Sequence, residues 1–417
     1  MSTPAIFSKT RAGATRFALI WMQVVSEPFI AFYTLLLFIL RKDLGATPLQ
    51  ISIFAAIRPL MAVFSFYWSS NLLRNRSKLI SNFMGAWVLS FLPFLCLPFI
   101  HNIYFVMFCA AIYQLFARAT IPSKMEILKL NLEKEKREKL FSRLYVLGFI
   151  ESIGLGLFVG KLLDTHIGAW QVLFPLAAIL SLSSVLIQMR IPLPENLKED
   201  PNVLPITKGR ILQPIKDSIH LMRSRPDFAH FQWGFMIGGF ALMFITPALH
   251  LYYVDSLQMT HHNLAIARYI WMGIGVTSST FLWRRALNST PIHQLTSRVI
   301  LGFSLFPLTL LFAPLSLLFV NAAFFFYGIA QAGSHLLWNL SGTLFAQSED
   351  SSKFSGVNIL MVGLRGVVAP LLGGLACSLF SPFTILIVGM VICFLGAGLG
   401  SIEKFRAKGF RGGFLEV

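Results

Sequence analysis

Apolar runs of about 20 residues alternate with short polar segments along this chain. A helix needs about 20 residues to cross roughly 30 Å of hydrocarbon, and its backbone groups must bond within their own segment. Because the runs are too long for barrel strands, the pattern predicts an all-α membrane protein with twelve transmembrane helices. The predicted spans are residues 17–40, 50–70, 79–100, 103–122, 144–160, 170–189, 228–253, 264–282, 299–318, 322–344, 359–379 and 383–399.

The polar segment 190–227 divides the chain into two halves. It holds seven Lys/Arg, five Asp/Glu and six prolines, and six predicted spans lie on each side of it. We therefore expect an N-terminal six-helix bundle over residues 1–189. A linker at 190–227 would join it to a C-terminal six-helix bundle and tail over residues 228–417.

Two of the polar segments have the pattern of surface helices. In the linker, apolar residues recur at steps of 3, 4 and 3, which predicts a helix in the membrane interface; they are Leu212, Ile215, Ile219 and Met222. The plainer interpretation is a surface helix that only tethers the halves. The loop 124–143 mixes Lys and Glu, and we expect it to form a charged helix on the membrane face.

Composition and charge support a membrane location. Hydrophobic residues make up 55% of the chain and charged residues 13%, about half the charged fraction of a soluble domain. The net charge of +17 lies between the apolar runs, so we attribute it to cytoplasmic loops and expect no nucleic-acid partner. With the N-terminus inside, 28 of the 35 Lys/Arg lie on the cytoplasmic side. Both termini and the linker are predicted to be cytoplasmic, in a multi-pass protein of a bacterial inner membrane or similar cell membrane.

The cysteines suggest no redox or metal chemistry. All four lie inside apolar runs without metal-ligand spacing, which is typical of small buried side chains. We expect no cofactor and no bound metal.

The two halves match one another weakly at a constant offset. A shift of 213 residues places 44–53 on 257–266, 141–142 on 354–355, and Gly160 on Gly373. Because the offset is shared at equivalent places in the two halves, it indicates a duplicated six-helix unit.

Several segments between and within the spans carry a family resemblance. DLGATPLQI follows span one, WSSNLLRNRSK follows span two, and FLWRRALNST follows span eight; GFIESIGLGLFVG and GLRGVVAPLLGG lie in spans five and eleven. In these segments the chain resembles the major facilitator superfamily of secondary transporters, which implies two pseudo-symmetric six-helix bundles around a central cavity. It departs from the family pattern at Asn71, which stands near an acidic position, and at Ala111, which replaces an arginine three residues before Gln114.

Six ionisable side chains lie well inside predicted spans, where each costs about 2.5–3.5 kcal/mol on insertion scales. Spans three, six, nine and twelve contain none. In the resembled fold those four helices face lipid and the other eight border the cavity, so the charges fall on helices that can shelter them. The six are Glu27, Arg58, Arg118, Glu151, Arg268 and Arg365.

Two interpretations stay open for each of three of these residues, Glu27, Arg118 and Arg268. Glu27, ten residues into its span, either couples transport to protons or solute, or forms a buried structural pair, for example with Arg58. Arg118 and Arg268 lie near span ends, where a long side chain can simply reach the interface.

The acid in span five and the arginine in span eleven occupy nearly matching repeat positions. At the offset of 213, Glu151 aligns with Leu364, which precedes Arg365. We expect both side chains to face the cavity from opposite halves, and a gate pair is one interpretation.

Span ten and span four supply uncharged candidates for binding a solute. A polar and aromatic face in a cavity helix can pack and orient a small molecule, although interhelical hydrogen bonding is an equal alternative. The candidates are Gln331, His335, Trp338 and Asn339 in span ten, and Gln114 in span four.

The sequence is compatible with three functions. The favoured one is a secondary transporter that works by alternating access about a midplane site. A membrane enzyme acting on lipid would need paired acids or an acid–His set at a membrane face, and the predicted loops offer only scattered Asp. A transporter-shaped receptor or assembly protein remains the third. No GxxxxGK[ST] motif is present, so ATP hydrolysis by that route is excluded.

The titratable residues favour a proton as the driving ion. Glu27, Glu151 and His335 can titrate, and four membrane arginines outnumber two acids, which favours an anionic or zwitterionic solute. We expect a monomer in the lipid bilayer, with the small solute and the proton as its partners.

The charge asymmetry predicts that the linker 190–227 is cytoplasmic. A cysteine placed there should not react with a membrane-impermeant maleimide in intact cells and should react after permeabilisation. A cysteine at Ser381, in the predicted outer loop before span twelve, is the matched positive control. Labelling of the linker in sealed cells would contradict the topology.

Overall fold

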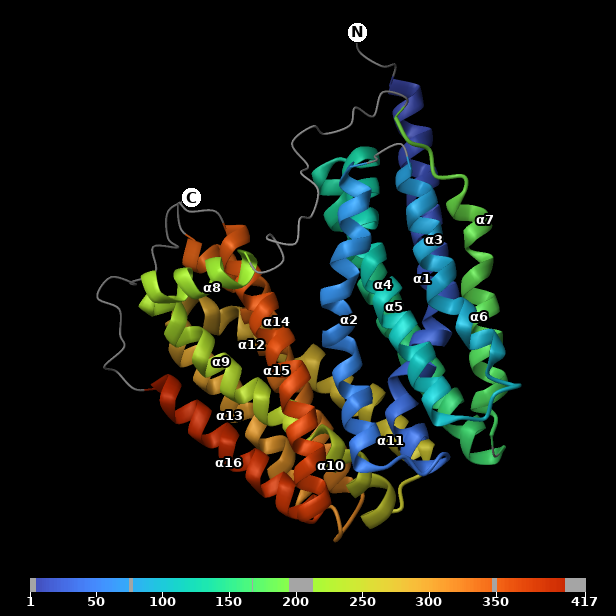
Figure 1. The fold of residues 1–417 in the computed structure, drawn as a ribbon. Coiled ribbons are helices and arrows are strands. Elements are labelled where there is room, and N and C mark those ends of the chain that lie inside the picture. Colours follow the sequence, from blue (N-terminus) through green and yellow to red (C-terminus); the bar gives the residue numbers. More distant parts are fainter. Residues whose placement is uncertain (1–4, 75–77, 167, 195–212, 347–350, 402–417) are drawn as a thin grey trace. The chain divides into compact units, whose positions relative to one another are not determined.

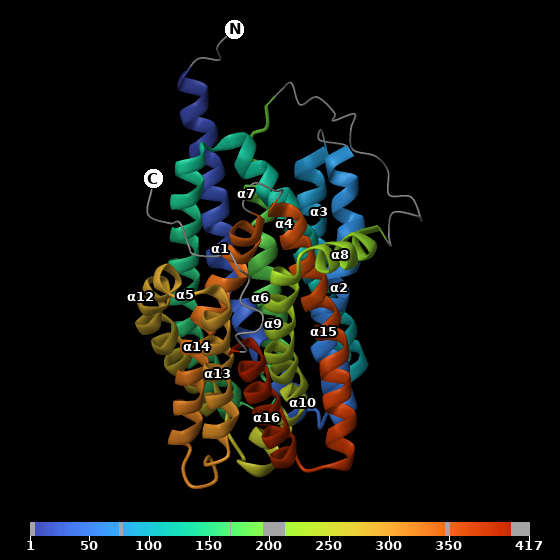
Figure 2. The ribbon, with the colours of Figure 1, turned by 90° about the vertical axis from the view of Figure 1, so that its left-hand side faces the viewer.

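The computed structural model describes residues 5–74, 78–166, 168–194, 213–346 and 351–401. Within these ranges every regular element is a helix, which confirms the predicted all-helical class (Figure 1). Figure 2 shows the same elements from the side. The chain divides into two compact units, residues 1–44 with 60–206 and residues 45–59 with 207–417. The predicted division into two six-helix halves and a linker stays a prediction.

The helices of the N-terminal part follow the first six predicted spans. They are α1 (Ala5–Lys42), α2 (Pro48–Arg74), α3 (Leu79–Phe91) with the 3₁₀ turn η2 (Leu92–Cys96), α4 (Ile103–Asn131), α5 (Lys134–Thr165), α6 (Trp170–Ser183) and α7 (Val185–Gln188).

The helices of the C-terminal part follow the linker helix and the last six predicted spans. They are α8 (Gln213–Ser224), α9 (Pro226–Phe244), α10 (Thr246–Leu251), η4 (Tyr252–Ser256), α11 (His261–Ala265), η5 (Ile266–Trp271), α12 (Met272–Ser289), α13 (Ile292–Leu310), α14 (Leu318–Ala346), α15 (Ser351–Leu379) and α16 (Pro382–Ser401). The segments η4 and η5 are π-helical.

Six of the described helical runs are long and apolar enough to cross a membrane. They are Arg11–Lys42, Leu79–Cys96, Ile103–Asn131, Trp170–Gln188, Pro226–Ser256 and Gly356–Leu379, and shorter apolar helices are Pro48–Ala62 and Pro382–Gly398. Twelve membrane crossings therefore stay a prediction. Along α6, large apolar side chains are exposed at Val172, Leu176 and Ile179, the helical spacing of a lipid-facing stripe.

An aromatic cluster forms the centre of the first unit. The ring of Phe29 is fully buried and meets Phe91, Phe94 and Phe174 edge-on, at centroid distances of 4.9, 4.7 and 5.6 Å. Edge-to-face pairs add to the stabilisation that burial provides. These rings hold α1 against α3, η2 and α6.

A second contact fixes one end of the first unit. The Asn131 side-chain amide, at the end of α4, donates to Thr15 Oγ1 of α1 and to the Pro192 carbonyl, each at 2.9 Å. The helix ends there, because Leu132 and Glu133 are extended and α5 begins at Lys134. The expected charged helix over residues 124–143 is therefore wrong: the segment is the end of α4, a break, and the start of α5.

In the second unit, glycines let two helices pack backbone to backbone. A Cβ added to Gly275 of α12 would collide with the Phe325 carbonyl of α14, and one added to Gly328 of α14 would collide with the Met272 carbonyl. Small residues permit such close approach in membrane proteins, where lipid offers no hydrophobic drive for association.

The second unit is also tied together near the linker. Arg225 donates to both carboxylate oxygens of Asp227 at 3.0–3.1 Å, and to the Phe345 carbonyl at the end of α14 at 3.0 Å. Its guanidinium also lies over the Phe354 ring of α15. A single bidentate arginine thus links the start of α9 to two other helices. The preceding α8 confirms the predicted linker helix, and its interfacial position stays a prediction.

Two short threonine motifs start helices at repeat-related positions. Thr47 Oγ1 accepts from the Gln50 N–H, and Gln50 Oε1 accepts from the Thr47 N–H, a reciprocal capping box with Pro48 at the first helical position of α2. Thr260 Oγ1 accepts from the Asn263 N–H and caps α11. Thr47 and Thr260 are separated by the offset of 213 that relates the two halves.

The backbone packing of α12 on α14 makes Gly328 sensitive to one added methyl group. We expect Gly328→Ala to force the two helices apart, at a cost of about 1–3 kcal/mol, and to lower the thermal midpoint of the purified protein in detergent. Gly234→Ala is the matched control, because Gly234 is buried but no atom lies within 4 Å of its added Cβ. Equal midpoints for the two variants would contradict the close crossing.

Candidate functional site

The carboxyl group of Glu27 is buried at the middle of α1. The residue is 4% exposed and is followed by Pro28, which interrupts the helix hydrogen bonding because proline has no N–H. A buried carboxylate is costly unless donors surround it. The Glu27 carboxyl group therefore needs hydrogen-bond donors from its own helix or from a neighbouring one.

Two neutral side chains donate to this carboxyl group. Gln23, one turn earlier on α1, donates from Nε2 to Glu27 Oε2 at 2.7 Å. The Ser152 hydroxyl of α5 donates to the other oxygen, Oε1. Gly148, one turn before Ser152, makes this possible, because a Cβ there would stand 2.7 Å from Gln23 Nε2.

The second acid of the first unit lies beside the same site. Glu151 precedes Ser152 on α5 and interacts electrostatically with Glu27, and its buried Oε2 has no hydrogen-bond partner among the described residues. Within the described part of the first unit, no cation forms a salt bridge with Glu27. The pairing of Glu27 with Arg58, and that of Glu151 with Arg365, stay predictions.

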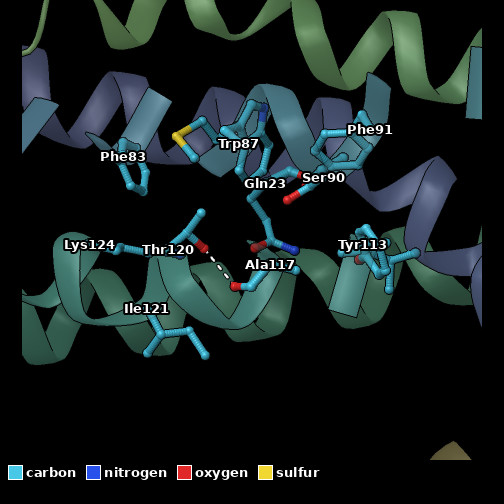
Figure 3. Close-up of a pocket in the computed structure, with 13 residues that line it drawn as sticks. Gln23, Phe83, Trp87, Ser90, Phe91, Tyr113, Ala117, Thr120, Ile121 and Lys124 are labelled. Carbon is cyan, nitrogen blue, oxygen red and sulfur yellow. Dashed lines mark hydrogen bonds between the residues drawn. The ribbon is translucent and has the colours of Figure 1, made fainter. Parts of the chain in front are cut away.

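A cavity of about 200 Å³ adjoins this site between α1, α3 and α4 (Figure 3). Its polar lining comes from Gln23 and Ser26 of α1, Ser90 of α3, and Thr120 and Lys124 of α4. The remainder is apolar: the aromatic side chains are Phe83, Trp87 and Phe91 on α3 and Tyr113 on α4, and the aliphatic ones are Met22, Ile30, Ala117 and Ile121. Gln23 thus contacts the cavity and the Glu27 carboxyl group at once.

The predicted residues of span four lie next to this cavity rather than in its lining. Gln114 is buried and Arg118 is half-buried, one turn apart on α4. The residues that precede them, Tyr113 and Ala117, belong to the lining. Neither Gln114 nor Arg118 is placed at the cavity by the structure.

In the second unit, Arg365 of α15 is 7% exposed and points at α9. Its Nη1 donates to the Phe235 carbonyl at 2.7 Å, and its guanidinium lies over the Phe235 ring, 5.0 Å from the centroid. Gly239 leaves the space that the guanidinium occupies, because a Cβ there would collide with it. This arginine is packed against α9 by a carbonyl and an aromatic face.

The predicted face of α14 divides into two parts. Gln331 and His335 are hydrogen-bonded to one another through Gln331 Nε2 and His335 Nε2 at 2.5 Å. Trp338 instead stacks on Phe235, with centroids 6.0 Å apart. The side chain of Asn339 lies outside the described residues.

Two further predicted arginines, Arg268 and Arg58, interact electrostatically with histidine and tyrosine side chains of the second unit. Arg268 lies in the π-helical segment η5 and interacts electrostatically with His250 and Tyr253. Arg58, in the stretch 45–59 that belongs to the second unit, interacts electrostatically with His335. Single π-turns inside helices frequently occur at functional sites.

A buried amide network in the second unit was missed by the sequence analysis. Gln232 of α9 donates to Asn358 of α15, and Asn358 Nδ2 donates to Ser341 Oγ of α14 at 2.7 Å. Uncharged polar residues inside spans were the available signal, and such interhelical bonds are common in membrane bundles. We interpret this network as structural.

The cavity residues Gln23, Trp87, Tyr113 and Lys124 were also missed. Gln23 precedes Glu27 by four residues, and Tyr113, Ala117, Thr120 and Lys124 step by 4, 3 and 4. That spacing places the four on one face of α4, and it was readable in the sequence. Lys124 was instead assigned to the loop after span four.

The sequence as a whole matches one protein family. The profile of the Major Facilitator Superfamily matches residues 25–370. A search of curated protein sequences finds no match.

Solved structures of transporters share the fold. A mutant form of the nucleoside transporter NupG superposes with a TM-score of 0.72 at 14% identity, over 94% of this chain and 100% of that chain. A POT family transporter in complex with 5-aminolevulinic acid gives 0.71 at 12% identity, over 95% and 96%. A bacterial homologue of the human lysosomal transporter Spinster, inward-facing and unoccupied, gives 0.63 at 12% identity, over 98% and 100%. At these identities the likeness concerns the fold alone.

Proposed function

Because the chain belongs to the major facilitator superfamily, we propose that it is a secondary active transporter that moves a small anionic or zwitterionic solute across a cell membrane, driven by protons that bind Glu27. The protein would work as a monomer by alternating access, with both termini in the cytoplasm.

The observation that carries the proton proposal is the environment of Glu27. An acid within a membrane helix is expensive and is a functional-site hypothesis by default. Here its described partners are an amide and a hydroxyl, which can remain hydrogen-bonded to either protonation state after local rotation. A site of this kind can gain and lose a proton without breaking an ion pair.

The charges of the described site residues support an anionic or zwitterionic solute. Arg365 in the second unit and Lys124 in the first lie within helical runs of membrane-crossing length, and Arg268 is a third cation, in the π-helical segment η5. Among the structural neighbours, one was solved with 5-aminolevulinic acid and another is a nucleoside transporter. The 5-aminolevulinic acid belongs to that neighbour, and it is consistent with a solute that carries both charges here.

Glu27→Gln tests the proton role, because glutamine keeps the shape and hydrogen bonds of a neutral carboxyl. Wild-type proteoliposomes should concentrate at least one component of an isotope-labelled metabolite extract when a pH gradient is imposed in the appropriate direction, measured by mass spectrometry. In the variant we expect that pH-driven accumulation to fall to the equilibrium level, while exchange of the same compound across the membrane continues.

Glu135→Gln is the control for this experiment, because Glu135 is an exposed acid in the first turn of α5. It should accumulate solute as the wild type does. Undiminished pH-driven accumulation in Glu27→Gln, at equal protein level, would refute the proton role of this residue.

A further inference from the structure

We propose that the cavity between α1, α3 and α4 binds a small planar aromatic anion, and that Gln23 couples its occupancy to protonation of Glu27. This rests on the proposed function, because it makes the cavity the solute site of a proton-driven transporter. Nothing in the family match or in the structural neighbours assigns this cavity or Gln23 a role.

The size of the cavity selects a small solute. Liquid water takes about 30 Å³ per molecule, so 200 Å³ has the room of roughly seven waters. Pockets for drug-sized ligands start near about 300 Å³. A single ring with one short substituent suits a space of this size.

The walls of the cavity select a planar ring. Trp87 contacts the cavity from α3, and its Nε1 donates to the Ser181 carbonyl of α6 at 3.0 Å, so the indole is held in place and its polar edge is already satisfied (Figure 3). Tyr113 is held by Phe29 and Tyr33, at centroid distances of 4.9 and 4.7 Å. Ala117 adds a small side chain to the same lining. Rigid aromatic walls favour stacking and edge contacts with an aromatic solute.

The charge of the lining selects an anion. Lys124 is the charged member of the residues that line the cavity, and the remainder are apolar, aromatic, hydroxyl or amide side chains. In Figure 3, Lys124 and Tyr113 lie toward opposite ends of the α4 wall, with Gln23 between them. The flexible lysine stem can bring its ammonium group toward a solute beside Gln23.

The side-chain amide of Gln23 can present either its carbonyl oxygen or its NH₂ group to the cavity. When Glu27 is ionised, the carboxylate only accepts, so Gln23 must turn its NH₂ group toward it, as observed at 2.7 Å. When Glu27 is protonated, its O–H can donate to Gln23 Oε1 after the amide rotates by half a turn. The NH₂ group then faces the cavity as a donor. Protonation of Glu27 therefore strengthens anion binding, and by linkage the anion favours the protonated acid.

Other titratable groups also lie near Glu27. Glu151 approaches from α5, and α4 contributes Lys124 in the cavity and Arg118 beside it. The described helices α3 and α6 carry no ionisable side chain. Glu27 is hydrogen-bonded directly to Gln23 of the cavity lining, and we therefore assign the coupling to it.

Binding of benzenesulfonate to the purified full-length protein in detergent, measured by calorimetry, tests the site. This probe stays an anion at both about pH 5.5 and about pH 8, so a change in affinity reports on the protein, and benzenesulfonamide is its neutral counterpart. We expect benzenesulfonate to bind about fivefold or more tighter at the lower pH, and more tightly than the sulfonamide. Absence of binding to the wild type would overturn the site.

Variants separate the parts of the proposal. Lys124→Met should weaken benzenesulfonate by about tenfold and leave benzenesulfonamide unaffected, and Ala117→Phe should fill the cavity and abolish both. Undiminished binding in both variants would overturn the site. Gln23→Leu and Glu27→Gln should each remove the pH dependence, and its persistence in either would overturn the coupling.

Gly148→Ala tests the same link without substituting any residue of the cavity lining, because the new methyl group would displace the Gln23 amide from Glu27. It should reduce the pH dependence, whereas Gly154→Ala on the same helix, where no atom lies within 4 Å of the added Cβ, should bind as the wild type does. Equal pH dependence in the two variants would overturn the amide link. These binding measurements do not depend on transport. If Glu27→Gln loses pH-driven uptake but its benzenesulfonate binding still depends on pH, the proton role of Glu27 stands and only the coupling through Gln23 is refuted.

Discussion

A carboxyl group inside a bilayer must find its hydrogen bonds within the protein, and that requirement fixes the position of α5 against α1. Glu27 receives one donor from its own helix and one from Ser152, which reaches it because Gly148 keeps the intervening surface bare. Two residues further along α1, the ring of Phe29 is fixed by aromatic rings of α3, η2 and α6. The rotation of α1 is thereby set from both sides. Gln23 then lies between the acid and the cavity, and the proposed function depends on this placement.

The second unit has a contact at the corresponding place with different chemistry. The offset of 213 relates Ser152 to Arg365, and both residues send a polar side chain from the helix of the fifth predicted span in their half to the helix of the first. In the first unit the acceptor is the Glu27 carboxyl group, whereas in the second it is the Phe235 carbonyl beside an aromatic face. A duplicated unit that kept the contact and changed its partners would carry a titratable acid in one half and a permanent cation in the other. This asymmetry supports the proposed proton-driven transport of an anion.

The positions of the helices could be predicted because bilayer thickness sets the length of an apolar run. The prediction of one charged helix over 124–143 is wrong, because Leu132 and Glu133 are extended and separate the end of α4 from the start of α5. Glu27 could be named as a candidate site residue because an acid within a membrane-spanning run is energetically costly. The spacing of Tyr113, Ala117, Thr120 and Lys124 predicts that they share one face of α4. The sequence does not say which way that face is turned, so it could not bring Lys124 and Gln23 together in one site. Trp87 was further hidden by its place on α3, a helix expected to face lipid and free of charged residues.

Coupling through an amide differs physically from coupling through an ion pair. Breaking a buried ion pair leaves an unpaired charge and costs several kcal/mol, which would hold the protein in one state. Rotation of the Gln23 amide exchanges one hydrogen bond for another, so the coupling free energy is the difference between two satisfied arrangements. Such differences are typically about 1–3 kcal/mol, or roughly 5–150-fold in affinity. A transporter must release its solute in every cycle, and a coupling of this size favours loading without preventing release. The rigid walls around Trp87 and Tyr113 serve the same end, because they add no ordering cost that the bound solute would have to offset.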